Sequence, residues 1–175
     1  MTTSDYIRSL FPEINEIKNE ALAKQVANVW LLAMERGGWE TIENIPFTLL
    51  IPDTKETLVD HTQRVTRMAM GVAAQRTDVD MDLVIAGGLL HDVGKLLEYE
   101  PVDGEGSVRK SPNGKLLRHP VSGAALALEA KVSDRLAHII AAHSKEGEVL
   151  QRIPEAIIIH HCDFTDFQIE IAKAI

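Results

Sequence analysis

The chain has 175 residues, of which 45% are hydrophobic and 25% charged, and this length and composition are typical of one folded domain. A formal net charge of -8 argues against a protein that binds duplex nucleic acid, because such proteins present a broad basic face. No apolar run reaches the roughly 20 residues of a membrane span, the N-terminus lacks the apolar core of a signal peptide, and Cys162 has no second cysteine to pair with. We therefore expect a cytoplasmic protein without membrane contact.

The first third of the chain has helical periodicity that is interrupted at a few points. We expect helices over 4–10 and 14–36, the second stopped by the Gly37-Gly38 pair. After a connector that contains two prolines, Asp53 and Glu56 stand three residues apart, which is the spacing of a capping box. This spacing predicts a helix that opens there and runs to about residue 75.

The rest of the chain is also predicted to be mostly helical. Asp80 and Ser133 are each placed to cap a helix, and Pro120 and Pro154 suit the first turn of two others. Between them, residues 100–118 are polar and rich in glycine, including the turn sequence Pro112-Asn113-Gly114, and are typical of a loop or a short hairpin.

These elements predict an all-α fold, a single-domain helical bundle with a loop or hairpin insertion near 100–118. We divide it into an N-terminal helical extension, 1–53, and a core, 54–175. The apolar stretch 29–32 in the extension either packs within the core or forms a dimer face, so we expect a monomer or a homodimer.

Several histidines and aspartates occupy positions that favour burial near one another. His61 lies on the apolar stripe of its predicted helix, and His143 continues the apolar face of another. His91 and Asp92 follow a nearly continuous apolar run, and Asp163 also follows one. Each residue alone fits a satisfied core position, but so many polar groups in apolar settings need a compensating partner. A metal ion would provide it.

The donor types indicate which metals would fit. Imidazole and carboxylate suit Fe, Mn, Co, Ni or Zn better than Ca. The single cysteine excludes a structural zinc site made of thiolates. A site of nitrogen and oxygen donors usually leaves coordination positions for water and substrate, which favours a catalytic site.

The segment Gly88-Leu89-Leu90-His91-Asp92-Val93-Gly94-Lys95 resembles the signature of the HD-domain metal-dependent phosphohydrolase superfamily, in its HD-x-G-K form. The other histidines and the last aspartate follow in the order of that family, from about Leu58 to Asp163. His119 lies in the sequence RHP-x-x-GA. After His143 the chain lacks the Gly-Tyr-Pro sequence of the cyclic-di-GMP phosphodiesterases, which disfavours that substrate.

The resemblance implies a ligand set and a reaction. His61, His91, Asp92 and Asp163 match the mononuclear ligands, and His119 and His143 match the additional histidines of binuclear members, in which Asp92 would bridge two ions. One or two divalent transition-metal ions, with Mg also possible, would activate water for attack on phosphorus. Asp92 and Lys95 would act in catalysis, Lys95 by steadying the developing phosphoryl charge; alternatively, Lys95 is an exposed lysine at a helix end.

The expected substrate is small and phosphorylated, and resembles a nucleotide. The stretch before His119 contains four basic residues and no acid, and these are candidates for phosphate contacts together with Lys95: Arg109, Lys110, Lys115 and Arg118. Alternatively the stretch is a solvated loop. His160 and His161 lie outside the ligand pattern and either serve as a proton shuttle or outer donor, or pack structurally.

Two other functions stay open at this point. A di-iron oxygenase of the same superfamily would use the same six positions to cleave a C–C or C–P bond with O₂. A non-catalytic, metal-stabilised module would bind a nucleotide or a protein partner instead.

Overall fold

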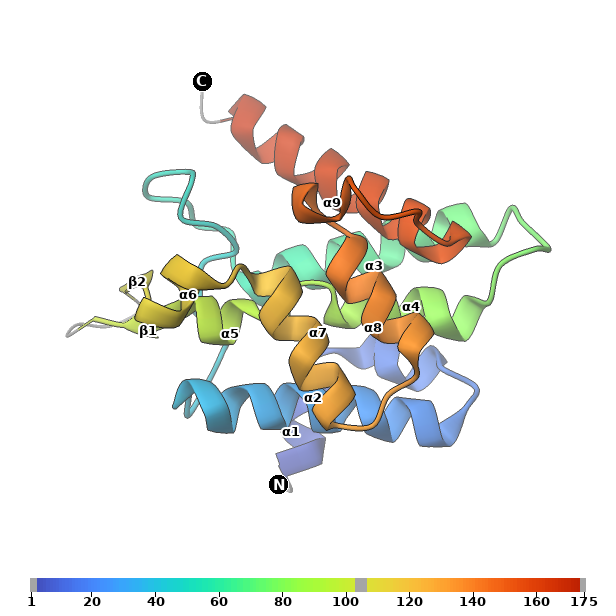
Figure 1. Cartoon of the computed structure of the whole chain (residues 1–175), viewed down its shortest axis with the longest axis horizontal. Coiled ribbons are helices and arrows are strands. Elements are labelled where there is room, and N and C mark those ends of the chain that lie inside the picture. The colour runs from blue at the N-terminus through green and yellow to red at the C-terminus, as the bar shows by residue number, and fades with distance from the viewer. Residues whose placement is uncertain (1–2, 103–106, 174–175) are drawn as a thin grey trace.

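The computed structural model describes residues 3–102 and 107–173. Over these residues the chain forms α-helices, two short 3-10 helices and one small sheet (Figure 1). In chain order the elements are α1 (Thr3–Leu10), η1 (Pro12–Glu16), α2 (Glu20–Gly37), α3 (Leu58–Ala73), α4 (Met81–Leu90), α5 (Lys95–Glu98), β1 (Tyr99–Pro101), β2 (Val108–Lys110), α6 (Pro112–Leu116), α7 (His119–Glu129), α8 (Asp134–Ala142), η2 (Lys145–Gly147) and α9 (Pro154–Lys173). The predicted all-α fold is confirmed.

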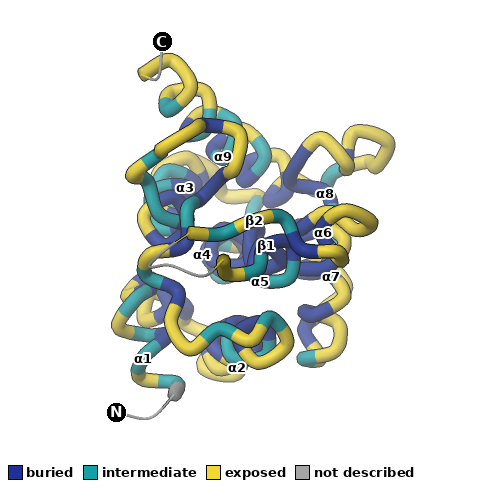
Figure 2. Tube along the Cα trace, turned by 90° about the vertical axis from the view of Figure 1, so that its left-hand side faces the viewer, coloured by how far each residue is buried: buried dark blue, intermediate teal, exposed yellow. Residues whose placement is uncertain are grey.

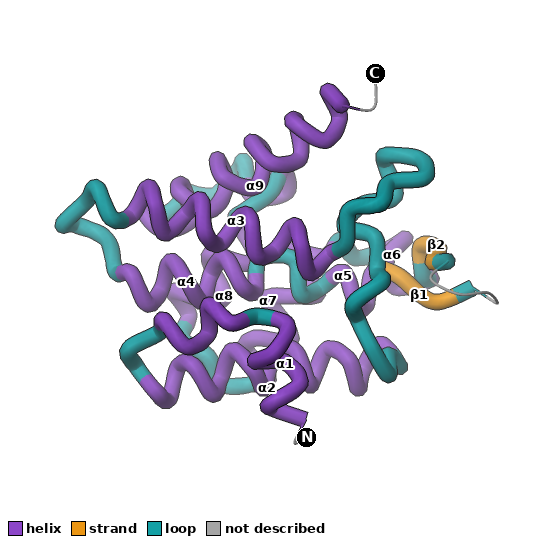
Figure 3. Tube along the Cα trace, turned by 180° about the vertical axis from the view of Figure 1, so that it is seen from behind, coloured by secondary structure: helices purple, strands orange, loops and turns teal. Residues whose placement is uncertain are grey.

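Helix α4 is the centre of the bundle. It packs between α2 on one side and α3 on the other, and α9 packs against both α3 and α4 (Figures 1 and 3). Residues 83–90 of α4 are all buried because the apolar run leaves no polar face for solvent. Figure 2 shows the same arrangement, with buried segments in the middle and exposed ones on the outer helices. The site residues are therefore carried by helices that enclose one core.

The N-terminal segment packs into this core through aromatic residues. The Trp30 indole stacks on Phe11, with ring centroids 4.8 Å apart, and donates a hydrogen bond to the Leu89 carbonyl at 3.1 Å. The prediction of one helix over 14–36 is wrong. The Asp82 carboxylate accepts hydrogen bonds from the backbone N–H groups of Lys18 and Asn19, and the helix is interrupted there. The predicted stop is confirmed, with Gly38 at a left-handed φ of 71°. The division at residue 54 stays a prediction.

The start of α3 also differs from its prediction. The Asp53–Glu56 capping box is absent: Asp53 has a left-handed φ of 55°, and α3 begins five residues after Asp53, at Leu58. The reason is a backbone bridge between Pro46 and Thr57, which keeps the chain extended up to the helix. The Thr57 side chain caps α3 instead, by accepting from the N–H of Asp60.

The predicted insertion contains an antiparallel hairpin, β1 with β2, in which Glu100 pairs with Arg109. Its connecting residues 103–106 lie outside the described residues. The expectation of a loop or hairpin turn for Pro112-Asn113-Gly114 is wrong, since α6 forms there with Ser111 as its N-cap. The caps predicted at Asp80 and Ser133 are confirmed. Among the described residues no helix combines the length and apolar character that crossing a membrane requires.

Candidate metal centre

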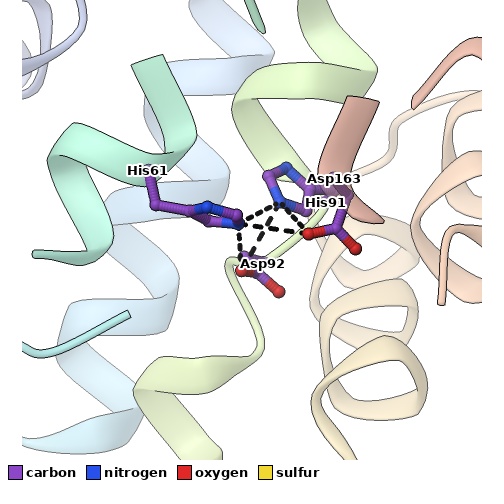
Figure 4. Close-up of side chains that lie close together, drawn as sticks. All are labelled: His61, His91, Asp92 and Asp163. Carbon is purple, nitrogen blue, oxygen red and sulfur yellow. Dashed lines mark hydrogen bonds and ion pairs between the residues drawn. The ribbon is translucent and has the colours of Figure 1, made fainter. Parts of the chain in front are cut away.

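Six predicted side chains converge on one buried centre from five parts of the chain. His61 lies in the first turn of α3, His119 begins α7 and Asp163 lies on α9, while His91 and His143 are the C-cap residues of α4 and α8. Figure 4 shows His61, His91, Asp92 and Asp163 pointing toward one another. All six side chains are nearly fully buried, and only that of Asp163 has more than a tenth of its surface exposed.

Asp92 lies in the middle and faces both sides. Its Oδ2 is 3.3 Å from Nε2 of His61 and 3.4 Å from Nε2 of His91. Its Oδ1 is 3.2 Å from Nε2 of His119 and 3.6 Å from Nε2 of His143. Two donor groups result, each with ligand atoms within 4.8 Å of one another: the first cluster is His61, His91, Asp92 and Asp163, and the second cluster is Asp92, His119 and His143.

The outer nitrogen of each of the four histidines is held by a hydrogen-bond acceptor. Nδ1 of His91 donates to the Gly88 carbonyl and Nδ1 of His143 to the Ile140 carbonyl, both at 2.7 Å. These carbonyls belong to the last turns of α4 and α8, where a helix leaves its own carbonyls without intrahelical partners. The remaining two histidines use distant carboxylates: His61 bonds Asp166 at 2.7 Å and His119 bonds Glu98 at 2.8 Å.

These hydrogen bonds leave the four Nε2 atoms to face the centre. A histidine whose Nδ1–H is donated outward presents a lone pair at Nε2, which is the form that binds metal. Within the described residues, buried His143 Nε2 and Asp92 Oδ2 have no hydrogen-bond partner, although Lys95 lies within ion-pair distance of the latter. Burial of unpaired polar atoms is costly, and a bound metal ion would remove this cost by taking them as ligands. Imidazole and carboxylate donors fit one or two divalent ions of the transition series.

The charges at the centre are tightly coupled. Burial would raise the pKa of Asp92, but the charges of Lys95, His91 and His119 hold it well below its usual range. Burial would lower the pKa of His61, but the neighbouring carboxylates of Asp163, Asp166 and Asp92 raise it to about 10. In the absence of metal, a proton on His61 therefore balances part of the carboxylate charge.

Lys95 is buried beside Asp92. Its Nζ is 2.6 Å from Asp92 Oδ2 and also donates to the Phe47 carbonyl. Burial would lower its pKa, but the Asp92 charge raises it to about 12, so the ammonium stays charged. Gly94 of the same motif is required by packing, because a Cβ there would lie 2.1 Å from the His119 carbonyl oxygen. The alternative of an exposed lysine is wrong, since Lys95 is 8% exposed.

A cavity of about 380 Å³ opens above the centre. Asp92, Asp163, His119 and Lys95 lie in its wall, together with two of the four predicted phosphate-binding residues, Lys110 and Arg118. The cavity lining does not include the other two: the Arg109 side chain pairs with Glu100 across the hairpin, and Lys115 is exposed on α6.

The remaining histidines lie outside both clusters. His160 donates from Nδ1 to the His143 carbonyl at 2.6 Å and so supports the chain next to a predicted ligand. His161 is exposed. His138 accepts a hydrogen bond from the N–H of Ile153 at 3.3 Å, a contact that links α8 to the start of α9.

Sequence reasoning missed the two carboxylates that hold His61 and His119. Asp166 lies three residues after Asp163 on α9, and this helical spacing was an available signal. Glu98 gave no comparable signal, because it lies 21 residues from His119 and the chain folds back through the hairpin to bring them together.

Comparisons with known proteins find relatives that are named as ribonucleases. Ribonuclease Y of Pseudothermotoga lettingae is 31% identical over 108 residues, which cover 62% of this chain and 18% of that protein. A 3'-5' exoribonuclease YhaM of Listeria monocytogenes is 31% identical over 118 residues, which cover 61% of this chain and 37% of that protein. The matched regions thus span less than two fifths of these relatives. No solved structure matches the chain significantly.

The family model of the HD domain matches residues 58–167. This range covers well over half of the chain and contains all the residues of the two donor clusters. Because the match and the buried His/Asp centre coincide, the chain belongs to the HD domain family.

Proposed function

We propose that this chain is a metal-dependent phosphohydrolase that cleaves a phosphomonoester or phosphodiester of a nucleotide or small phosphorylated metabolite with activated water. The observation that carries the proposal is the pair of donor clusters that share Asp92 in the wall of a cavity with several cationic groups. Both relatives are named as ribonucleases, which favours a phosphodiester.

The two clusters support a proposed set of metal ligands. His61, His91, Asp92 and Asp163 would hold one ion, and Asp92, His119 and His143 would hold a second, so that Asp92 is common to both sets. Fe, Mn, Co, Ni or Zn suits these donors, and Mg is possible. When bound, such an ion polarises a phosphate oxygen and lowers the pKa of water.

The chain's own residues supply the rest. The Lys95 ammonium, fixed by Asp92 and the Phe47 carbonyl, faces the cavity and would steady the negative charge that develops on the phosphoryl group. Lys110 and Arg118 would bind outer phosphate oxygens, since both line the cavity. Arg109 and Lys115 stay predicted contacts that the cavity lining does not support.

We also propose that the protein works in the cytoplasm as a monomer or homodimer. Its one cysteine, Cys162, is free and buried, as expected of a protein in a reducing compartment.

The test combines metal content with hydrolysis. The protein is purified without chelator, its metals are counted, and Mn-dependent hydrolysis of bis(p-nitrophenyl) phosphate and p-nitrophenyl phosphate is measured. Asp92→Ala is the inactive variant, and Val149→Ala, at a side chain 91% exposed and outside the cavity lining, is the matched control. We expect transition metal in the wild type, and hydrolysis that Asp92→Ala loses and Val149→Ala retains.

Two results would overturn the proposal. No bound metal after incubation with excess would remove its basis. Two irons without hydrolysis, with an EPR signal of a mixed-valent pair, would favour oxygenase chemistry at the same ligands.

A further inference from the structure

The cavity above the metal centre has an apolar wall that phosphate chemistry alone does not require. Leu49 and Leu50 come from the connector between α2 and α3, and Phe164 and Phe167 come from α9. Leu50 is 75% exposed and Leu49 40% exposed, although both border a site of buried charges. Exposed apolar side chains that gather at one cavity indicate a ligand with an apolar part.

The wall is fixed to the metal-binding residues. Phe164 directly follows Asp163, and Phe167 lies three residues further on the same face of α9. The Phe167 ring meets Phe47 edge to face at 6.1 Å, and the Phe47 ring lies 4.9 Å from that of His61. Phe167 is therefore placed near the first cluster through Phe47, whereas the Phe164 ring lies 4.6 Å from that of His160.

The cationic groups lie next to the second cluster. Arg118 precedes His119, and Lys145 follows His143 by two residues. Both line the cavity, as does Lys110 on β2. Lys145 has no ion-pair partner among the described residues, whereas Arg118 lies within ion-pair distance of Glu98 and Glu146. The cavity wall thus combines apolar side chains, of which Phe167 lies near the first cluster, with cationic groups next to the second.

We propose that Phe164, with Phe167 and the two leucines, binds the base of a nucleotide, so that the substrate is a nucleoside phosphate or the terminal nucleotide of a short chain. A volume of about 380 Å³ lies at the lower end of the range of about 300–1,000 Å³ for small-molecule sites, which suits one nucleotide unit. Bases stack on aromatic rings with little regard to sequence. This inference rests on the proposed function and names its substrate class.

The test compares two ligands that differ only in the base. Adenosine 5′-phosphonate and ribose 5-phosphonate resist ester hydrolysis, and their affinities for the Mn-loaded protein are measured by calorimetry. We expect the adenosine compound to bind roughly 5- to 150-fold more tightly. Phe164→Leu keeps an apolar side chain but removes the ring and should abolish most of this preference. Phe164→Tyr should retain it.

Controls separate the wall from the metal site. Phe164→Leu should leave the affinities for Mn and for ribose 5-phosphonate within about twofold of wild type, and Val149→Ala should change nothing. Equal affinity of the wild type for both ligands overturns the inference, as does a Phe164→Leu variant that weakens both equally. Hydrolysis of generic diesters without a base preference would refute only the base site, whereas a base preference without hydrolysis would refute only the proposed function.

Discussion

The two carboxylates behind the histidines give a sharp test of the binuclear assignment. Asp166 holds His61 of the first cluster, and Glu98 holds His119 of the second. Asp166→Asn and Glu98→Gln are matched changes, because each keeps the size of the side chain and replaces a charged acceptor by an amide. We expect each variant to weaken one ion and to spare the other.

The contacts set the magnitude. Glu98 Oε2 accepts from Nδ1 of His119 at 2.8 Å and from its backbone N–H at 2.7 Å, while Oε1 lies 3.2 Å from Arg118. An amide can still accept from His119 but would turn its NH₂ group toward the guanidinium. Loss of such an outer partner typically weakens metal binding by about 10- to 100-fold, which is about 1.4–2.7 kcal/mol. The conservative Glu98→Gln should lie near the lower value and Glu98→Ala near the upper.

The assay is a calorimetric titration of metal-free protein with Mn. Because the first cluster offers four donor residues and the second three, we expect a tight and a weak class of ion. Asp166→Asn should weaken the tight class, and Glu98→Gln the weak one. If either variant weakened both classes equally, or if both left Mn binding unchanged, the reasoning that each carboxylate supports one cluster would be refuted.

Other variants and conditions test separate parts of the structure. Gly94→Ala should destabilise the protein by about 1–3 kcal/mol in urea unfolding, because the added Cβ would meet the backbone of α7. Gly71→Ala, whose added Cβ would meet nothing within 4 Å, should stabilise the protein by about 0.5–1 kcal/mol. Similar losses of stability in both variants would contradict the packing argument. The pKa of His61 is raised from 6.5 to about 10 because its hydrogen bonds to carboxylates outweigh burial, so its contribution to the stability of the metal-free protein is complete below pH 6.5 and is lost as the pH rises toward 10. Stabilisation by Mn should grow over the same interval, since the ion displaces that proton, and a metal-free protein whose urea midpoint rises with pH would refute this assignment. Arg118→Ala should raise KM more than it lowers kcat, and an unchanged KM would remove Arg118 from the substrate contacts.

Local patterns account for the parts of the site that sequence could predict. Helical periodicity placed His61 on an inward stripe, and His143 on the apolar face of its helix. The structure adds that His91 and His143 each bond the carbonyl three residues earlier, a contact made within the last turn of one helix. Such local contacts depend only on the spacing of residues along one helix, and this spacing can be read from the sequence.

Contacts between distant segments could not be predicted in this way. Asp166 is 105 residues from His61, so the packing of α9 on α3 decides their hydrogen bond. The hairpin gives a second example. Its register pairs Arg109 with Glu100, and neighbouring residues of a strand point to opposite faces, so Lys110 lines the cavity and Arg109 does not. The start of α3 was missed for the same reason, because a bridge to Pro46 overrides the local capping signal.

The difference of one carboxylate between the clusters bears on how ion and substrate bind together. Among the described residues the second cluster has no counterpart of Asp163, so an ion held there would leave more positions for phosphate oxygens, and Arg118 directly precedes its ligand His119. A phosphate that contacts both this ion and Arg118 must raise the affinity for the ion by the same factor as the ion raises the affinity for phosphate. Glu98 contacts His119 and Arg118 at once, and we therefore expect Glu98→Gln to weaken substrate as well as the second ion. Asp166 contacts His61 and Arg64, and neither of these lines the cavity, so Asp166→Asn has no such route to the cationic groups there.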